Sequence, residues 1–181
     1  MPDRYILIAN HPSGADILIL NSIFTVYPLA QHGVKKWFFL GRIAKATGVV
    51  FVERENKTSR NQVKKQLIKY AKSGKNLLIY PEGGCFGKHL RNFKYGACDI
   101  SIASNIPILP VYLQYEAEND FEWGWDMNLP QHLFHLFTAI NKRANCYIFQ
   151  PIYPTNFSDS QSFTKYIHKH YQEWEAKYRL N

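Results

Sequence analysis

Short apolar runs alternate with amphipathic stretches along most of this chain. The apolar runs are bounded by Gly, Pro or polar residues and predict buried strands, at residues 4–10, 48–54, 76–80, 106–115 and 145–152, with a strand, or a strand entering a short helix, at 36–41. Between them, apolar residues at helical spacing predict helices, at residues 13–27, 59–73, 96–104, 128–140 and 159–179. This alternation is typical of an α/β fold, so we expect a mixed, mainly parallel sheet flanked by helices.

The composition supports one folded domain, which we expect to span residues 1–181. Hydrophobic residues make up 46% of the 181 residues, which suits a single well-filled core. No apolar run approaches the roughly 18–20 residues that a membrane-spanning helix needs. Cys85, Cys98 and Cys146 are odd in number and far apart. They predict neither a disulfide framework nor a zinc site, and they favour a reducing compartment.

The chain carries an excess of positive charge, with 22 Lys+Arg against 14 Asp+Glu and a net charge of +8. Such a surface favours an anionic partner, whether nucleic acid, anionic lipid or a phosphorylated metabolite. No nucleic-acid-binding motif accompanies the charge, so we expect no nucleic-acid partner. The histidine pairs His132 with His135 and His168 with His170 lack a third ligand of fitting geometry, so no metal site is predicted.

The segment HPSGAD links the first predicted strand to the first predicted helix. On a regular helix, two side chains five residues apart point about 140° away from each other. The proline and glycine bend the chain, so His11 in the loop can meet Asp16 in the first helical turn. Asp16 would then accept a hydrogen bond from one imidazole nitrogen and leave the other free as a general base. Alternatively, Ser13 and Asp16 form only a capping-box-like helix start, and His11 is a surface loop residue.

A second candidate segment follows the strand at 76–80. Glu82, Gly83 and Gly84 form a turn whose glycines let backbone N–H groups approach a ligand closely. Lys88 and Arg91 add positive charge to the same loop. Loops at the carboxyl ends of strands are where α/β sheets usually bind ligands. The alternative is an ordinary turn with a solvated basic face.

Arg54 closes the predicted strand GVVFVER. A guanidinium at a strand end can bind a phosphate with two parallel hydrogen bonds. An exposed arginine without such a task is the alternative.

These segments occur in a defined order: NHPSGAD, then GVVFVER, then YPEGG followed by FKYGA, then the apolar strand IPILPVYL. In this order they resemble the motifs of the glycerolipid and lysophospholipid acyltransferase family. Those motifs are a His and an Asp separated by four residues, a strand ending in Arg, Pro-Glu-Gly, and a Pro-rich apolar strand. The resemblance covers roughly residues 5–115, and the ordered set is far more specific than any one motif.

The resemblance implies an enzyme that moves a fatty acyl group from an acyl thioester, on CoA or on an acyl carrier protein, to a hydroxyl of a lysophospholipid or glycerol phosphate. His11 would deprotonate that hydroxyl, and Asp16 would orient and support the imidazolium. Arg54 would hold the acceptor's phosphate, while Glu82 and Gly83 would shape the acceptor pocket. Nearby backbone N–H groups would stabilise the oxyanion. No cofactor or metal is implied, because the thioester is already activated.

Two features depart from the family pattern. Many members read Glu-Gly-Thr-Arg where this chain has Gly84 and Cys85 after Gly83. The lysophosphatidylcholine acyltransferase branch, which also has Cys there and an aromatic Trp-x-Trp segment further on, lacks that Arg too. Lys88 or Arg91 would then take over phosphate binding. Many members also begin with apolar anchoring helices, so this chain is either a fragment or minimal version, or it docks on lipid by its own surface.

The expected location is peripheral, on the cytoplasmic side of a membrane surface. Aromatic residues next to lysines suit a lipid headgroup interface, and candidates are Lys35, Lys36, Trp37, Phe38, Phe39, Trp123, Trp125, Leu129, Leu133, Phe134 and Phe137. Core packing is the alternative for each. Two other functions stay open: a membrane-binding domain of the same fold with impaired catalysis, and a thioester hydrolase using Cys85 as nucleophile with His89.

Overall fold

The computed structural model describes residues 1–31, 50–52, 57–87, 89–124 and 127–179. Arg54, Lys88, Trp125 and the stretch 35–39 lie outside the described residues. Within them, the strands form one sheet in the order β3 (Val50–Val52), β2 (Tyr27–Gln31), β4 (Leu77–Ile79), β1 (Ile6–Ala9), β5 (Ile108–Tyr115), β6 (Ala144–Ile148). Neighbouring strands are parallel except that β6 runs antiparallel to β5. The expected mixed, mainly parallel α/β sheet is confirmed.

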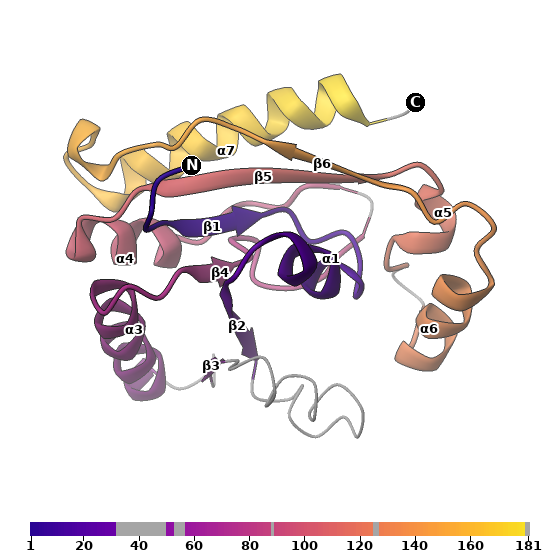
Figure 1. Ribbon diagram of the computed structural model, residues 1–181, viewed down its shortest axis with the longest axis horizontal. Coiled ribbons are helices and arrows are strands. Elements are labelled where there is room, and N and C mark those ends of the chain that lie inside the picture. The colour runs from indigo at the N-terminus through magenta and orange to yellow at the C-terminus, as the bar shows by residue number, and fades with distance from the viewer. Residues whose placement is uncertain (32–49, 53–56, 88, 125–126, 180–181) are drawn as a thin grey trace.

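The helices cover both faces of this sheet, and Figure 1 shows their arrangement. They are α1 (Asp16–Ile23), α3 (Lys57–Lys72), α4 (Gly96–Ser104), α5 (Glu118–Phe121), α6 (Leu129–Thr138) and α7 (Ser160–Tyr178), with a short 3-10 turn at Pro154–Asn156. In the figure, α3 and α4 lie towards one end of the sheet, and α5 and α6 lie beyond the other end. No helix of the described residues combines the length and apolar character needed to cross a membrane.

Strand β1 explains why two helical layers form. Ile6 and Ile8 are buried in a core with residues of α3, α4 and α7, whereas Leu7 and Ala9 are buried against α1. Successive side chains of a strand point to opposite faces, so an uninterrupted apolar strand needs cover on both. This is the pattern of a parallel sheet buried on two sides.

The predicted helix at 13–27 is too long at both ends, since α1 covers only Asp16–Ile23. Helix α1 ends at Ile23, and strand β2 follows from Tyr27. Pro28 disfavours helical geometry at the residue before it, and Tyr27 instead pairs with Leu77 of β4. The five-residue strand was overlooked because the proline interrupts its short apolar pattern. The short helix α5 was also not predicted, and the strand expected at 145–152 ends at Ile148.

The parallel strands bring their three carboxyl ends, and the loops that follow them, to one edge of the sheet. His11 follows the end of β1, Glu82 follows the end of β4, and Tyr115 is the last residue of β5. Because β1 pairs with both β4 and β5 in parallel, their carboxyl ends lie side by side. This edge is where α/β sheets place their ligand sites.

Candidate active site

The structure brings His11 and Asp16 together as the bent loop predicts. His11 Nδ1 lies 2.8 Å from Asp16 Oδ2. The same carboxylate, which is fully buried, accepts hydrogen bonds from the Ser13 backbone N–H at 3.0 Å and from the Tyr115 hydroxyl at 2.5 Å. A carboxylate acting only as an acceptor places the proton of the imidazole on Nδ1. Nε2 of His11 therefore carries the lone pair, as a general base requires.

The helix-cap interpretation is only half correct. Asp16 does accept from the Ser13 N–H, which is one half of a capping box. The reciprocal bond is absent, because Ser13 Oγ accepts from the Ala15 N–H at 3.2 Å, and the helix begins at Asp16 without a side-chain cap. One carboxylate thus anchors the start of α1 and orients the imidazole, so the two interpretations do not exclude each other.

Glu82 ties the two neighbouring loops together. Its side chain is buried, with Oε1 accepting from the His11 N–H and Oε2 from the Arg91 N–H, both at 2.9 Å. Burial raises the pKa of Glu82, while these two N–H bonds act in the opposite direction. Both carboxylate oxygens are used to hold backbone, so Glu82 shapes the site by fixing the loop that carries His11.

The glycines after Glu82 allow the chain to turn tightly. Gly83 has φ +82°, a conformation that favours glycine, and a side chain there would meet the Lys94 side chain. A side chain at Gly84 would meet the Phe86 ring. The Arg91 guanidinium lies over that ring, 3.9 Å from its centre. Of the three predicted phosphate-binding residues, the structure therefore places Arg91, whereas Arg54 and Lys88 lie outside its described part.

Two aromatic contacts to the dyad were missed from the sequence. Tyr80 stacks on the His11 ring with 3.9 Å between ring centres and 14° between planes, and Tyr115 bonds to Asp16. Tyr80 stands directly before the Pro-Glu-Gly turn, so its place in the motif was a usable signal. Tyr115 lies 99 residues from Asp16, and no local spacing rule relates them. Burial raises the pKa of Tyr115, and Asp16 raises it further.

The segment after β5 closes over the same loop. The Trp123 N–H donates to the Pro12 carbonyl at 2.8 Å. His132 of α6 is fully buried, and its Nε2 accepts from the Gly14 N–H at 3.0 Å. In the sequence, His132 was considered only as a metal ligand together with His135, and no third ligand was found. In the structure it bonds instead to the backbone of Gly14, which lies 118 residues away in the chain.

A small pocket borders the loop that carries His11. The residues that line it include His11, Glu82 and a cluster of charged side chains near the end of α7. In that cluster the Arg179 guanidinium lies 2.8 Å from Glu122 and 3.3 Å from Glu118. The imidazole of His11 is 18% exposed, so part of the ring stays accessible while its Nδ1 is bonded to Asp16.

The environment of Cys85 does not favour a nucleophilic thiolate. Burial raises the pKa of its thiol far above the ordinary value, and the charge of Asp16 raises it further. The thiolate is the reactive form of cysteine, so the hydrolase hypothesis loses its nucleophile at neutral pH. Among the described residues, no three His, Cys, Asp or Glu side chains gather into a metal-binding group.

The strand-end dyad, the Pro-Glu-Gly turn and the α/β sheet match the acyltransferase class that the sequence motifs resemble. A comparison of the sequence with models of protein families gives the same class. The family model described as Acyltransferase matches residues 2–114, which is more than half of the chain, so the chain belongs to this family.

Two relatives show what the chain is similar to within this family. The chain is 30% identical over 166 residues to a lyso-ornithine lipid O-acyltransferase of Rhodobacter capsulatus, covering 86% of this chain and 59% of the relative. It is 25% identical over 118 residues to a 1-acyl-sn-glycerol-3-phosphate acyltransferase of Neisseria gonorrhoeae, covering 65% and 46%. The chain therefore spans only about half the length of these relatives.

A solved structure shares the fold. The crystal structure of the 1-acyl-sn-glycerophosphate (LPA) acyltransferase from Thermotoga maritima superposes with a TM-score of 0.67 at 24% identity, covering all of this chain and 70% of that one. At this identity the likeness is evidence for the fold alone.

Proposed function

We propose that this chain transfers a fatty acyl group from an acyl thioester to the hydroxyl of a lysolipid, such as a lysophospholipid or lyso-ornithine lipid, or of glycerol phosphate. The observation that carries the proposal is the 2.8 Å contact between His11 Nδ1 and Asp16, which leaves Nε2 unprotonated on a partly exposed imidazole. Nε2 removes the hydroxyl proton as the oxygen attacks the thioester carbonyl. The tetrahedral intermediate then collapses, the C–S bond breaks, and the proton passes from His11 to the leaving thiolate.

The surrounding residues take supporting roles in this proposal. Asp16 stabilises the imidazolium that forms during attack. Glu82 with Gly83 and Gly84 holds the loop that borders the acceptor. The positive charges expected to meet the acceptor's anionic group are Arg91 and, on sequence grounds alone, Arg54 and Lys88. The donor carrier, CoA or an acyl carrier protein, is a matter for the assay.

The first prediction is acceptor-dependent thiol release. Purified protein is incubated with acyl-CoA or acyl carrier protein and, in separate arms, lyso-ornithine lipid, lysophosphatidic acid and lysophosphatidylethanolamine. We expect release of the free carrier thiol only with a lysolipid present, and mass spectrometry should find one matching diacyl product per thiol. Equal release without acceptor would mean hydrolysis. Lipid binding without release in every arm would favour the catalytically impaired membrane-binding domain.

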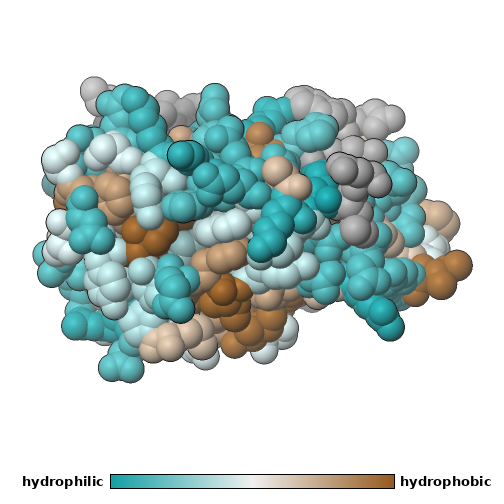
Figure 2. All heavy atoms as spheres, turned by 90° about the horizontal axis from the view of Figure 1, so that it is seen from above, coloured by the Kyte–Doolittle hydropathy of each residue, from teal (hydrophilic) through white to brown (hydrophobic). Residues whose placement is uncertain are grey.

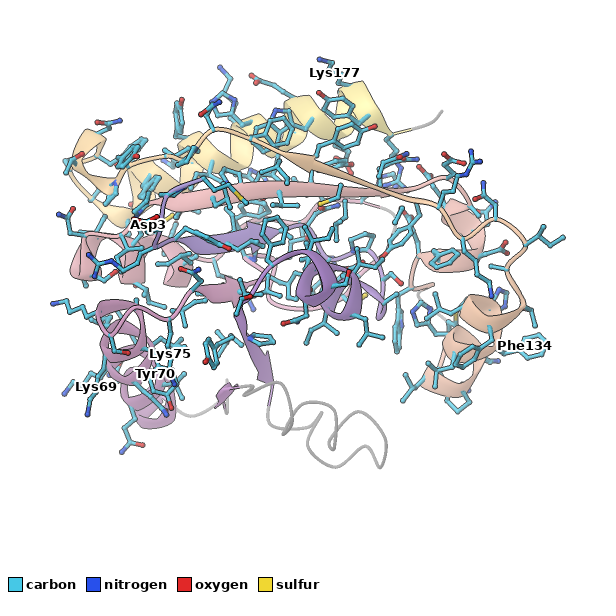
Figure 3. The ribbon with its side chains drawn as sticks, viewed as in Figure 1. Asp3, Lys69, Tyr70, Lys75, Phe134 and Lys177 are labelled. Atoms are coloured by element: carbon cyan, nitrogen blue, oxygen red, sulfur yellow. The ribbon has the colours of Figure 1, made fainter. Side chains whose placement is uncertain are left out.

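We also propose that α6 docks on a membrane surface. Phe134, Phe137 and Ile140 are 67%, 76% and 100% exposed, and Lys142 and Arg143 follow them. Phe134 points outward from α6, away from the sheet (Figure 3). Figure 2 shows apolar residues at this end of the molecule, and others in the lower middle and at the left of the same face. Exposed aromatics next to basic residues suit an anionic lipid surface. Association on the cytoplasmic side stays a prediction.

The second prediction tests this surface. The double variant Phe134→Ser/Phe137→Ser should sediment with phosphatidylcholine–phosphatidylglycerol vesicles at least about tenfold more weakly, because each buried aromatic side chain contributes about 1.5–3 kcal/mol. The matched control is Ile102→Ser, an exposed apolar residue on α4, towards the other end of the sheet (Figure 1). Equal sedimentation of wild type and double variant would contradict the docking surface, as would an equal loss in the control.

A further inference from the structure

Helix α6 turns one polar side chain into the protein. His132 is fully buried, while Phe134 and Phe137 of the same helix are exposed. Its Nε2 accepts from the Gly14 N–H at 3.0 Å and lies 3.4 Å from Ser13 Oγ. These are loop residues between the two members of the dyad, so α6 is fastened directly to the chain that carries His11 and Asp16.

The hydrogen bond fixes the state of this imidazole. Since Nε2 accepts from a backbone N–H, the ring proton resides on Nδ1, and Nδ1 is buried without a hydrogen-bond partner among the described residues. Burial lowers the pKa of His132, which keeps the ring neutral and Nε2 able to accept. A buried histidine with one nitrogen left without a hydrogen bond lowers the stability of the folded protein. In return, its other nitrogen bonds to the loop.

The loop is shaped to receive the ring. A β-carbon on Gly14 would lie 3.1 Å from His132 Nε2 and 3.7 Å from the Trp123 ring. Trp123 packs against His132 with 4.6 Å between ring centres. The backbone N–H of Trp123 donates a hydrogen bond to the Pro12 carbonyl. Backbone and imidazole therefore meet closely, and the glycine leaves room for that approach.

From these contacts we propose that His132 is a positioning residue for the acyl transfer described above. It fixes Ser13 and Gly14, the Ser13 N–H in turn donates to Asp16, and Asp16 orients His11. His132 acts through the loop and does not touch substrate. It lies beyond the residues 2–114 that the family model matches, so this part of the site comes from the segment that follows the shared motifs. The inference rests on the proposed function for its kinetic readout alone.

The test compares His132→Leu, which removes the acceptor, with His132→Gln, whose Oε1 can accept from Gly14. His135→Gln on the same helix is the matched control. We expect His132→Leu to lower kcat about tenfold with little change in the KM of the donor. His132→Gln should recover most of the rate, and the control should match wild type. Wild-type kcat in His132→Leu, or equal losses in the Leu and Gln variants, would overturn the proposal.

A second readout does not depend on activity. The Nδ1–H of His11, bonded to a buried carboxylate, should give a downfield proton NMR signal. His132→Leu should shift or broaden that signal, and His132→Gln should restore it. If His132→Leu does not fold, Gly14→Ala provides the other side of the contact: its methyl group should press on Nε2 and produce the same change. An unaltered signal in a folded Leu or Ala variant would overturn the inference even if the chain proves to have no transferase activity.

Discussion

His11→Ala should lower kcat for acyl transfer by about 10³-fold, since a positioned general base contributes about 10²–10⁴ in rate. Attack on the thioester needs the hydroxyl proton removed, and the Asp16 contact leaves the lone pair of His11 Nε2 free on a partly exposed ring. The KM of the acyl donor should change little, because the imidazole acts in the transition state. The measurement is steady-state thiol release with the best acceptor of the panel.

The control for this prediction is His170→Ala, which removes a histidine of α7 that pairs with Glu173 on the surface. It should retain the wild-type rate, and both variants should melt near the wild-type temperature. If His11→Ala remained active while Cys85→Ser lost activity, the general-base assignment would fail and the thiol hypothesis would return despite the raised pKa of Cys85. Full activity in both His11→Ala and Cys85→Ser would exclude His11 and Cys85 alike as the reacting group.

The fold was predictable where local pattern and tertiary burial agree. Strand β1 is apolar at each position because both of its faces are covered, and α7 repeats its apolar positions at helical spacing. Prediction failed at β2, where Pro28 interrupts the short apolar pattern that would mark a strand, although it also disfavours helix at Tyr27. Pairing with the distant strand β4 completes the extended conformation.

The residues of the candidate site also fall into two groups, those that the sequence predicted and those that it did not. His11, Asp16 and Glu82 were predicted from the ordered motifs that resemble the acyltransferase family. Each stands at the end of a predicted strand or the start of a helix, and parallel strands bring such ends together. Tyr115 and His132 were not found as site residues, because their partners lie 99 and 118 residues away and no spacing encodes that contact. These long-range contacts join the segment after residue 114 to the motif-bearing part. On this basis we propose that residues 1–181 act as one acyltransferase domain.

Asp16→Asn isolates the charge of the dyad. The amide oxygen can take the place of Oδ2 and accept from Ser13 N–H and His11 Nδ1–H, as the carboxylate does. The amide nitrogen then faces the Tyr115 hydroxyl, which can rotate and accept, since a hydroxyl is both donor and acceptor. The Ser13 N–H can only donate, so it selects the orientation of the amide that keeps the proton of His11 on Nδ1. What the substitution removes is the negative charge.

We therefore expect Asp16→Asn to fold well and to transfer acyl groups at least about 10²-fold more slowly, because the imidazolium of the transition state loses its buried counter-charge. The free energy of unfolding, from urea titration, should stay near wild type or rise, since burying an amide costs less than burying a carboxylate. Asp99→Asn, a partly exposed carboxylate paired with Lys64, should change neither quantity by much.

The comparison decides what the buried carboxylate is for. A fall in turnover with stability retained shows that the negative charge serves the reaction, since the hydrogen bonds of the helix start survive in the amide. Unchanged turnover would leave Asp16 as an anchor for the start of α1 and remove the charge from the mechanism.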